Sequence, residues 1–179
     1  MRQVNWGIVG LGNIAEKFAK AFQFSKNAKL LGIASLDQKK INKFQDKFQI
    51  EEKYCFSSYE KLLSCSDVDI IYIALPNSLH HEWIVKCIEK EKKILVEKPA
   101  TTNFFQIKDI QNKLSDKNLL FSEAFMYRFH PQIIKVVELI KDNTIGELIS
   151  LESSFGVDIL TKKNLFGFKK RKKLNKESR

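Results

Sequence analysis

The sequence predicts an α/β protein built on a doubly wound parallel sheet. Short apolar runs with the character of fully buried strands alternate with segments whose apolar residues recur every three or four positions. This alternation continues to about residue 121, and a glycine-rich turn follows the first strand directly. Strands that alternate with helices in this way form a parallel sheet with helices on both faces.

Each expected element follows from its own pattern. The expected strands span residues 4–9, 30–35, 53–56, 68–75, 94–96 and 119–121. The expected helices lie at about 13–24, after Asp37, after a Ser57-x-x-Glu60 capping box, from Leu79 onward and after the capping residue Thr102. The first helix repeats Ile14, Phe18 and Phe22 every four residues, which gives it one buried face.

The pattern changes after Ser122. Residues 123–130 are polar and aromatic, Pro131 suits the first turn of a helix, and residues 148–155 alternate like a strand. One helix, one strand and a basic tail cannot bury a second core. We therefore predict a first domain at residues 1–123, followed at residues 124–179 by the start of an incomplete α+β second domain.

Composition excludes several classes of protein. The 179 residues are 44% hydrophobic and 29% charged, as is ordinary for a soluble globular chain. No apolar run approaches the roughly 20 residues of a membrane helix, and residues 4–9 already form a strand, so we predict neither membrane association nor a signal sequence. The three cysteines form no Cys-x-x-Cys pair, which indicates reduced thiols, a cytoplasmic location and no metal site.

The net charge of +10 raises the question of nucleic-acid binding, but its distribution argues against that function. Residues 165–179 carry seven of the 31 Lys and Arg residues and a single Glu. Most of the excess charge is therefore in a terminal tail and does not form a patterned basic face. A short run such as Lys169–Lys173 is usually solvated, so we predict no nucleic-acid partner.

The motif Gly10-x-Gly12-x-x-Ala15 lies between the first strand and the first helix. The first glycine permits a tight turn, the second lets the backbone approach a pyrophosphate, and Ala15 is small enough for close helix–strand packing. The helix N-terminus, at Asn13 and Ile14, would offer N–H groups and a positive dipole to phosphates. The motif predicts a Rossmann-type dinucleotide site, with a plain tight turn as the alternative.

The second strand ends at Ser35, where an NAD site usually has Asp or Glu and an NADP site often has Arg nearby. Asp37 either caps the next helix or contacts a ribose. Lys39 and Lys40 either reach a 2′-phosphate or lie in solvent. The cofactor is thus NAD or NADP, and the sequence leaves that choice open.

Polar and special residues follow four of the strands, at 10–13, 76–77, 97–99 and 123–130. In an open α/β sheet ligands bind beyond the carboxyl ends of the strands, so these segments predict one site. Lys98 could donate a hydrogen bond to a substrate oxygen and stabilise negative charge there. Pro99 restricts Lys98 to extended backbone and allows a cis peptide. An exposed lysine beside a turn proline is the alternative interpretation.

Four motifs, in order, carry a family resemblance: Gly10-Leu-Gly12-Asn-Ile-Ala15, Tyr72-Ile-Ala-Leu-Pro76-Asn77-Ser-Leu-His80, Glu97-Lys98-Pro99 and Glu123-Ala-Phe-Met-Tyr-Arg128-Phe-His130-Pro131. From residue 3 to about 155 the chain resembles the glucose–fructose oxidoreductase / inositol dehydrogenase (Gfo/Idh/MocA) family, most closely its sugar and dihydrodiol dehydrogenase-like branch. The resemblance implies NAD(P)-dependent hydride transfer on a sugar, polyol or related alcohol or ketone, in a full-length protein that forms a homo-oligomer.

The resemblance also implies residue roles. Lys98 is the implied catalytic residue, near the nicotinamide, and Glu97 the implied ligand of a cofactor ribose. The nucleotide cleft would be lined by Leu75, Pro76, Asn77 and His80, although His80 could instead be an ordinary residue of the first helical turn. Tyr127 and Arg128 are weaker candidates for substrate contact.

The chain departs from this family in its length and in its histidines. Members are roughly twice as long, and their second domain carries an Asp-x-x-x-His-like pair whose histidine is the general base. Here the three histidines are His80, His81 and His130, and none follows Pro131. We therefore expect a chain truncated at Arg179, with the general base in the missing part. Two interpretations stay open: the nucleotide-binding half of an oxidoreductase, or a catalytically incomplete fragment that only binds the dinucleotide.

Overall fold

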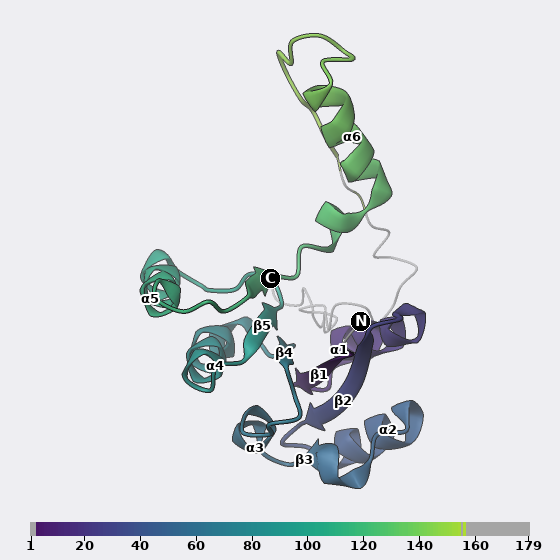
Figure 1. Ribbon diagram of the computed structural model, residues 1–179, viewed down its shortest axis with the longest axis vertical. Helices are drawn as coiled ribbons and strands as arrows, with labels where there is room; N and C mark the ends of the chain where they lie inside the picture. The colour runs from purple at the N-terminus through teal and green to yellow at the C-terminus, as the bar shows by residue number, and fades with distance from the viewer. Residues whose placement is uncertain (1–2, 155, 157–179) are drawn as a thin grey trace, which may run out of the picture. The chain divides into compact units, whose positions relative to one another are not determined.

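The computed structural model describes residues 3–154 and 156. In this part of the chain one parallel sheet has the strand order β3-β2-β1-β4-β5-β6 (Figure 1). The strands are β1 Val4–Val9, β2 Ala28–Ala34, β3 Cys55–Phe56, β4 Ile70–Ile73, β5 Lys93–Val96 and β6 Phe121–Glu123. The order reverses between β1 and β4, which is the switch point of a doubly wound, Rossmann-like sheet. The predicted fold class is confirmed.

Helices connect the strands and follow the apolar periodicity of the sequence. The α-helices are α1 Asn13–Ala21, α2 Gln38–Phe48, α3 Tyr59–Leu63, α4 Asn77–Glu89, α5 Phe104–Leu114 and α6 Pro131–Lys141. Short 3-10 helices are η1 Phe22–Phe24, η2 Glu52–Tyr54 and η3 Met126–Phe129. No helix within the described ranges is both long enough and apolar enough to cross a membrane.

The core consists of two layers, one on each face of the sheet. On one face α1 and α2 contribute buried side chains that include Ala15, Ile41 and Phe44. On the other face α3, α4 and α5 contribute a larger cluster that includes Leu62 and Ile84. Figure 1 shows these two groups of helices on opposite sides of the strands. Because β4 is covered on both faces, all four of its residues are buried, which explains its continuous apolar run.

The helix starts confirm one predicted cap and correct two. The Asp37 carboxylate accepts hydrogen bonds from the backbone N–H groups of Lys39 and Lys40, so it caps α2. The cap of α5 is Asn103 and not Thr102, because the Asn103 side chain accepts from the N–H of Gln106. The cap of α3 is Ser58, one residue after the predicted Ser57.

Three strand predictions also need correction. The strand predicted at 53–56 is confined to Cys55–Phe56, because Glu52–Tyr54 forms a 3-10 helix. Strand β6 lies two residues later than the predicted 119–121, because Val96 pairs with Glu123. The predicted strand at 148–155 is wrong within its described part: residues 148–154 form no strand, and Ile149 is 94% exposed. A strand needs a neighbour for its backbone hydrogen bonds, and this segment pairs with none of the described strands. Phe155 and the predicted basic tail, 162–179, lie outside the described residues.

The chain divides into two compact units, one ending at His130 and one beginning at Pro131. The first contains the whole sheet and both core layers. The second begins with α6, none of whose residues is buried. Residues 124–130 belong to the unit that contains the sheet. The predicted domain boundary after residue 123 stays a prediction.

Candidate functional site

The register of the sheet brings the strand ends together. Val9 pairs with Ile73, Ile73 with Val96, and Val96 with Glu123. On its other side Val9 pairs with Ala34. The carboxyl ends of these strands therefore lie side by side along one edge, as predicted. The residues that follow directly along this edge are Gly10, Ser35, Ala74, Glu97 and Ala124.

The two glycines of the first turn have different surroundings. Gly10 has φ +89°, and a Cβ there would lie 2.6 Å from the carbonyl oxygen of Ala74 and 2.8 Å from Leu75 Cδ2. Only glycine fits that position without displacing backbone. Gly12 is exposed, and a Cβ there would meet no protein atom within 4 Å. The space beside Gly12 is therefore open to a ligand.

Two helices begin at the switch point without a side-chain cap. No described side chain caps α1, which starts at Asn13 after β1, or α4, which starts at Asn77 after β4. By contrast, side chains cap α2, α3 and α5. The first backbone N–H groups of a helix have no partner within the helix, and they favour anions together with the helix dipole. The two uncapped N-termini therefore follow β1 and β4, the strands at which the sheet order reverses.

The end of the second strand is closed by internal hydrogen bonds. Ser35 is buried, and its Oγ accepts from the N–H of Asp37 at 3.1 Å. The Asp37 carboxylate in turn accepts from the first turn of α2. The interpretation of Asp37 as a helix cap is therefore confirmed. Its negative charge is stabilised by the N–H groups of the first turn of α2. Lys39 and Lys40 are exposed.

The Glu97–Ala100 segment, called here the Lys98 loop, follows β5 directly. The Lys98–Pro99 peptide bond is cis, as the sequence allows. Lys98 is exposed and Glu97 is half-buried. The loop thus presents a lysine ammonium group and a carboxylate at the edge of the sheet, next to the end of β4.

Tyr72 of β4 donates a hydrogen bond to Glu97 Oε1 at 2.6 Å. Tyr72 is 1% exposed, and its ring packs on Phe18 with centroids 4.1 Å apart. Burial, with a further contribution from the bond to Glu97, raises the pKa of Tyr72 far above its ordinary value. The hydroxyl therefore stays protonated and acts as a donor to the carboxylate.

His80 of α4 lies between the segment after β4 and the Lys98 loop. It is fully buried, and its Nδ1 lies 2.7 Å from the carbonyl oxygen of Pro99. Its Nε2 lies 2.9 Å from the carbonyl oxygen of Leu75. Each ring nitrogen thus lies within hydrogen-bond distance of a backbone carbonyl, one from each of these two segments. Its predicted contact with a cofactor stays a prediction.

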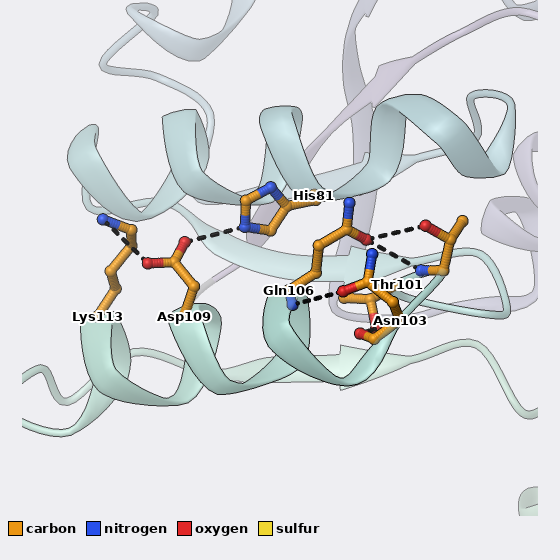
Figure 2. Close-up of polar contacts among 7 residues, drawn as sticks. His81, Thr101, Asn103, Gln106, Asp109 and Lys113 are labelled. Atoms are coloured by element: carbon orange, nitrogen blue, oxygen red, sulfur yellow. Dashed lines mark hydrogen bonds and ion pairs between the residues drawn. The ribbon is translucent and has the colours of Figure 1, made fainter.

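The remaining predicted residues differ in exposure and in their position along the edge of the sheet. Leu75 is buried, whereas Pro76 and Asn77 are exposed at the start of α4. Tyr127 and Arg128 are exposed in η3, beyond the end of β6. His81 faces away from this group, because its Nε2 lies 2.9 Å from Asp109 Oδ2 of α5 (Figure 2).

The structure gives contacts at the candidate site to two residues that the sequence analysis quoted in motifs without assigning them a role. One is Tyr72, whose hydroxyl bonds Glu97. The other is Glu123, whose Oε1 accepts from the N–H of Ala100 at 2.7 Å. A hydroxyl within the most apolar strand and a carboxylate at a strand end were the available signals.

A hollow of about 630 Å³ lies elsewhere on the molecule. Its lining includes Gln3, just before β1, and Ala28, the first residue of β2. These residues mark the amino ends of the strands, opposite the edge that gathers the glycines and the Lys98 loop. The candidate site predicted from the strand ends is therefore distinct from this hollow.

Comparison with known proteins identifies the family of this chain. Residues 4–125 match the Gfo/Idh/MocA family, described as an oxidoreductase family with an NAD-binding Rossmann fold. Trans-1,2-dihydrobenzene-1,2-diol dehydrogenase of Xenopus tropicalis is 30% identical over 156 residues, which cover 86% of this chain and 47% of the relative. A dTDP-3,4-didehydro-2,6-dideoxy-alpha-D-glucose 3-reductase of Saccharopolyspora spinosa is 30% identical over 87% of this chain and 46% of its own length.

Solved structures give the same result. A 3-ketoreductase from Actinomadura kijaniata, solved in complex with NADP, has a TM-score of 0.72 and 31% identity over 82% of this chain and 46% of that protein. A scyllo-inositol dehydrogenase from Lactobacillus casei shares the fold, with a TM-score of 0.75 and 24% identity over 82% of this chain and 43% of that one. The chain spans about half the length of the curated relatives it matches. It belongs to the Gfo/Idh/MocA oxidoreductase family, and residues 4–125 are its NAD-binding Rossmann fold.

Proposed function

We propose that this chain is the cofactor-binding part of an NAD(P)-dependent oxidoreductase that acts on a sugar, polyol or related alcohol or ketone. The observation that carries the proposal is the alignment of four strand-end segments with two uncapped helix N-termini at the switch point. The dihydrodiol dehydrogenase and sugar 3-reductase relatives support the substrate class, because both names describe chemistry between a hydroxyl and a carbonyl group.

The residues at the carboxyl edge fit a dinucleotide. The open space beside Gly12 and the first N–H groups of α1, at Asn13 and Ile14, would receive the pyrophosphate. Ser35 would lie at the adenosine ribose. Further binding residues assigned to the crevice are Leu75, Pro76, Asn77, His80 and Glu97, with His80 reaching it only through the backbone it bonds.

Lys98 is the residue to which we assign the chemistry. When bound, the nicotinamide supplies or accepts the hydride. The Lys98 ammonium donates a hydrogen bond to the substrate oxygen and so stabilises the negative charge that develops there during reduction. In the opposite direction the same contact holds the substrate hydroxyl. Tyr127 and Arg128, exposed beyond β6, are assigned to the substrate side.

Dinucleotide titration tests the proposal. Wild-type protein should bind NAD(H) or NADP(H) in calorimetry or nucleotide fluorescence. Gly12→Val should weaken that binding at least about tenfold while leaving the unfolding free energy within about 1 kcal/mol, because the added side chain occupies space that no protein atom fills. A folded wild-type protein that binds neither dinucleotide would refute the proposal.

A second interpretation is that the chain as given binds the dinucleotide without catalysis. It is favoured by the share of each relative that the chain covers, about half. Steady-state assays with polyols and sugar ketones separate the two. Turnover that is lost in Lys98→Ala, with cofactor affinity retained, would exclude the binding-only interpretation.

For the whole protein we further propose a cytoplasmic location and a homo-oligomeric state. The location is supported by the cysteines Cys55, Cys65 and Cys87, which are all free thiols. Analytical ultracentrifugation of the purified protein tests the oligomeric state, and a single monomeric species would exclude it.

A further inference from the structure

Side chains from other elements hold both ends of the Lys98 loop. At its start the Glu97 carboxylate accepts from Tyr72 of β4 at 2.6 Å through Oε1. At its end the N–H of Ala100 donates to Glu123, at the end of β6, at 2.7 Å. These two partners are 25 and 23 residues away from the groups they bond. Neither bond belongs to the backbone pairing of the sheet.

The bond from Tyr72 fixes the direction of Glu97. A carboxylate has two oxygens, and here Oε1 is taken by the short bond to a buried hydroxyl. Within the described part of the chain, the other oxygen, Oε2, accepts a single longer bond of 3.3 Å, from the N–H of Lys98. Oε2 therefore has lone-pair capacity left for a ligand hydroxyl. A carboxylate held in this way needs no reorientation when a ribose binds.

The bond from the Ala100 N–H to Glu123 fixes the end of the Lys98 loop. Ala100 is 2% exposed, so its N–H is shielded from water and needs a protein acceptor. A carboxylate acceptor gives a charge-assisted bond, which is stronger than a neutral one. Lys98 lies in the chain between Glu97 and Ala100, the two residues that these bonds hold. This limits how far the backbone of Lys98 can move.

We propose that Tyr72 and Glu123 are positioning residues for dinucleotide binding, Tyr72 by orienting the Glu97 carboxylate and Glu123 by fixing the backbone of the Lys98 loop. The proposal rests on the proposed function, since it assigns a ribose to Glu97. It goes further by naming two residues that do not themselves touch the cofactor but set the geometry of those that do.

The chain offers a matched control for Tyr72. Tyr54 donates to Asp67 Oδ2 at 2.7 Å, which is a hydroxyl–carboxylate bond of nearly the same length. Tyr54 and Asp67 precede β3 and β4, so this pair lies at the amino ends of the strands. Removing the Tyr54 hydroxyl therefore removes a hydroxyl–carboxylate bond of similar length, in a more exposed setting, at the opposite edge of the sheet.

The experiment compares Tyr72→Phe with Tyr54→Phe in NADH and NADPH titrations of the full 179-residue chain. Tyr72→Phe keeps the ring in the core and removes only the donor. We expect it to weaken dinucleotide binding roughly 5- to 20-fold, which is less than a whole hydrogen bond to a charged group because Tyr72 acts through Glu97. Tyr54→Phe should bind as wild type does. Denaturant unfolding of both variants checks that each is folded during the titration.

Glu123 is tested by rescue. Glu123→Leu removes the acceptor and should weaken binding roughly 5-fold or more and speed hydrogen exchange of the Ala100 amide. Glu123→Gln keeps an acceptor oxygen and should restore affinity to within about 3-fold of wild type. A purely structural role would lower stability in Glu123→Leu without changing the affinity of the folded protein.

The outcomes separate the two proposals. If wild type binds neither dinucleotide, the proposed function fails, and the positioning roles fail with it. If wild type binds and both Tyr72→Phe and Glu123→Leu bind equally well, the positioning proposal alone is overturned. Equal losses in Tyr72→Phe and Tyr54→Phe would also overturn it, because the effect would then not depend on Glu97.

Discussion

At the residue scale, the two glycines of the first turn show how one amino acid serves two purposes. Gly10 is required by the protein itself, because its φ is positive and a Cβ would collide with the Ala74 carbonyl. Gly12 has an extended backbone, φ −98° and ψ −172°, which any residue can adopt. The described structure therefore does not require glycine at this position.

This difference predicts opposite effects of alanine. Gly10→Ala should lower the unfolding free energy by about 2 kcal/mol or more, through backbone strain and the clash at Ala74. Gly12→Ala should change it by less than about 1 kcal/mol, because a Cβ there meets no protein atom and the remaining cost is that of alanine at the N-cap of α1. Urea unfolding of both variants measures the two values. Equal losses would show that Gly12 also has a structural requirement.

The thiol of Cys87 gives a prediction with a pH dependence. Burial raises its pKa to about 12, from an ordinary value of about 8.5. Between these values the thiol ionises only in the unfolded chain, so ionisation favours unfolding. Stability from this group is fully present below about pH 8.5 and is lost progressively as the pH rises toward 12.

Two measurements check this prediction. At pH 8.5 iodoacetamide should alkylate Cys87 in urea-unfolded protein but not in folded protein, where the side chain has no exposure. The unfolding free energy of wild type should fall relative to Cys87→Ala only above about pH 8.5. A parallel pH dependence of the two proteins would contradict the assigned pKa.

At the element scale, the helices differ in whether a side chain satisfies the N–H groups and positive dipole at their N-termini. Asp37 supplies a carboxylate to the first turn of α2, whereas α1 and α4 have no such partner. The capped helix therefore has less need for an anion at its N-terminus. The uncapped helices are the ones that flank the switch point.

Asp37 is accordingly expected to contribute to stability and not to cofactor affinity. Asp37→Ala should lower the unfolding free energy by about 1 kcal/mol, and Asp37→Asn, which keeps the acceptor oxygen, should change it by a few tenths. Both should bind NAD(H) or NADP(H) as wild type does. A loss of NAD affinity in both variants, beyond about threefold, would instead assign Asp37 to the ribose.

The type and order of the sheet elements could be predicted because their patterns are local. Apolar runs and four-residue repeats depend on neighbouring positions, so β4 and α1 were both recognisable. Choosing between adjacent polar residues was harder: Thr102 and Asn103 are both good caps, and the backbone turn decides between them. The segment 148–154 shows the remaining limit, because alternation specifies a strand only when a partner strand is present.

At the scale of the whole molecule, the site could be predicted where it depends on topology. Parallel strands place their carboxyl ends together, so Gly10 and Lys98 could be assigned to one edge from the sequence. The contacts that hold the Lys98 loop could not. Tyr72–Glu97 and Glu123–Ala100 join residues more than 20 positions apart, and no local pattern encodes their distance or direction.

The two-unit organisation predicts where a cofactor will stabilise the chain. Binding at 100 times the dissociation constant should add about 2.7 kcal/mol to the unfolding free energy of the cofactor-binding unit. In native-state hydrogen exchange, β1 and β4 amides should gain protection with NADH or NADPH. Amides of α6, which buries no residue and belongs to the second unit, should exchange rapidly with or without it. Protection of α6 equal to that of β4 would contradict the division.

The lengths of the outer strands have a consequence for assembly. β3 has two residues and β6 three, whereas β1 and β2 near the centre have six and seven. An extended segment of another molecule could gain few backbone hydrogen bonds at either border. Short edge strands of this kind disfavour the addition of strands from other molecules that leads to fibrils. Copies of this chain that associate specifically would therefore do so through side chains on helices and loops, and not by extending the sheet.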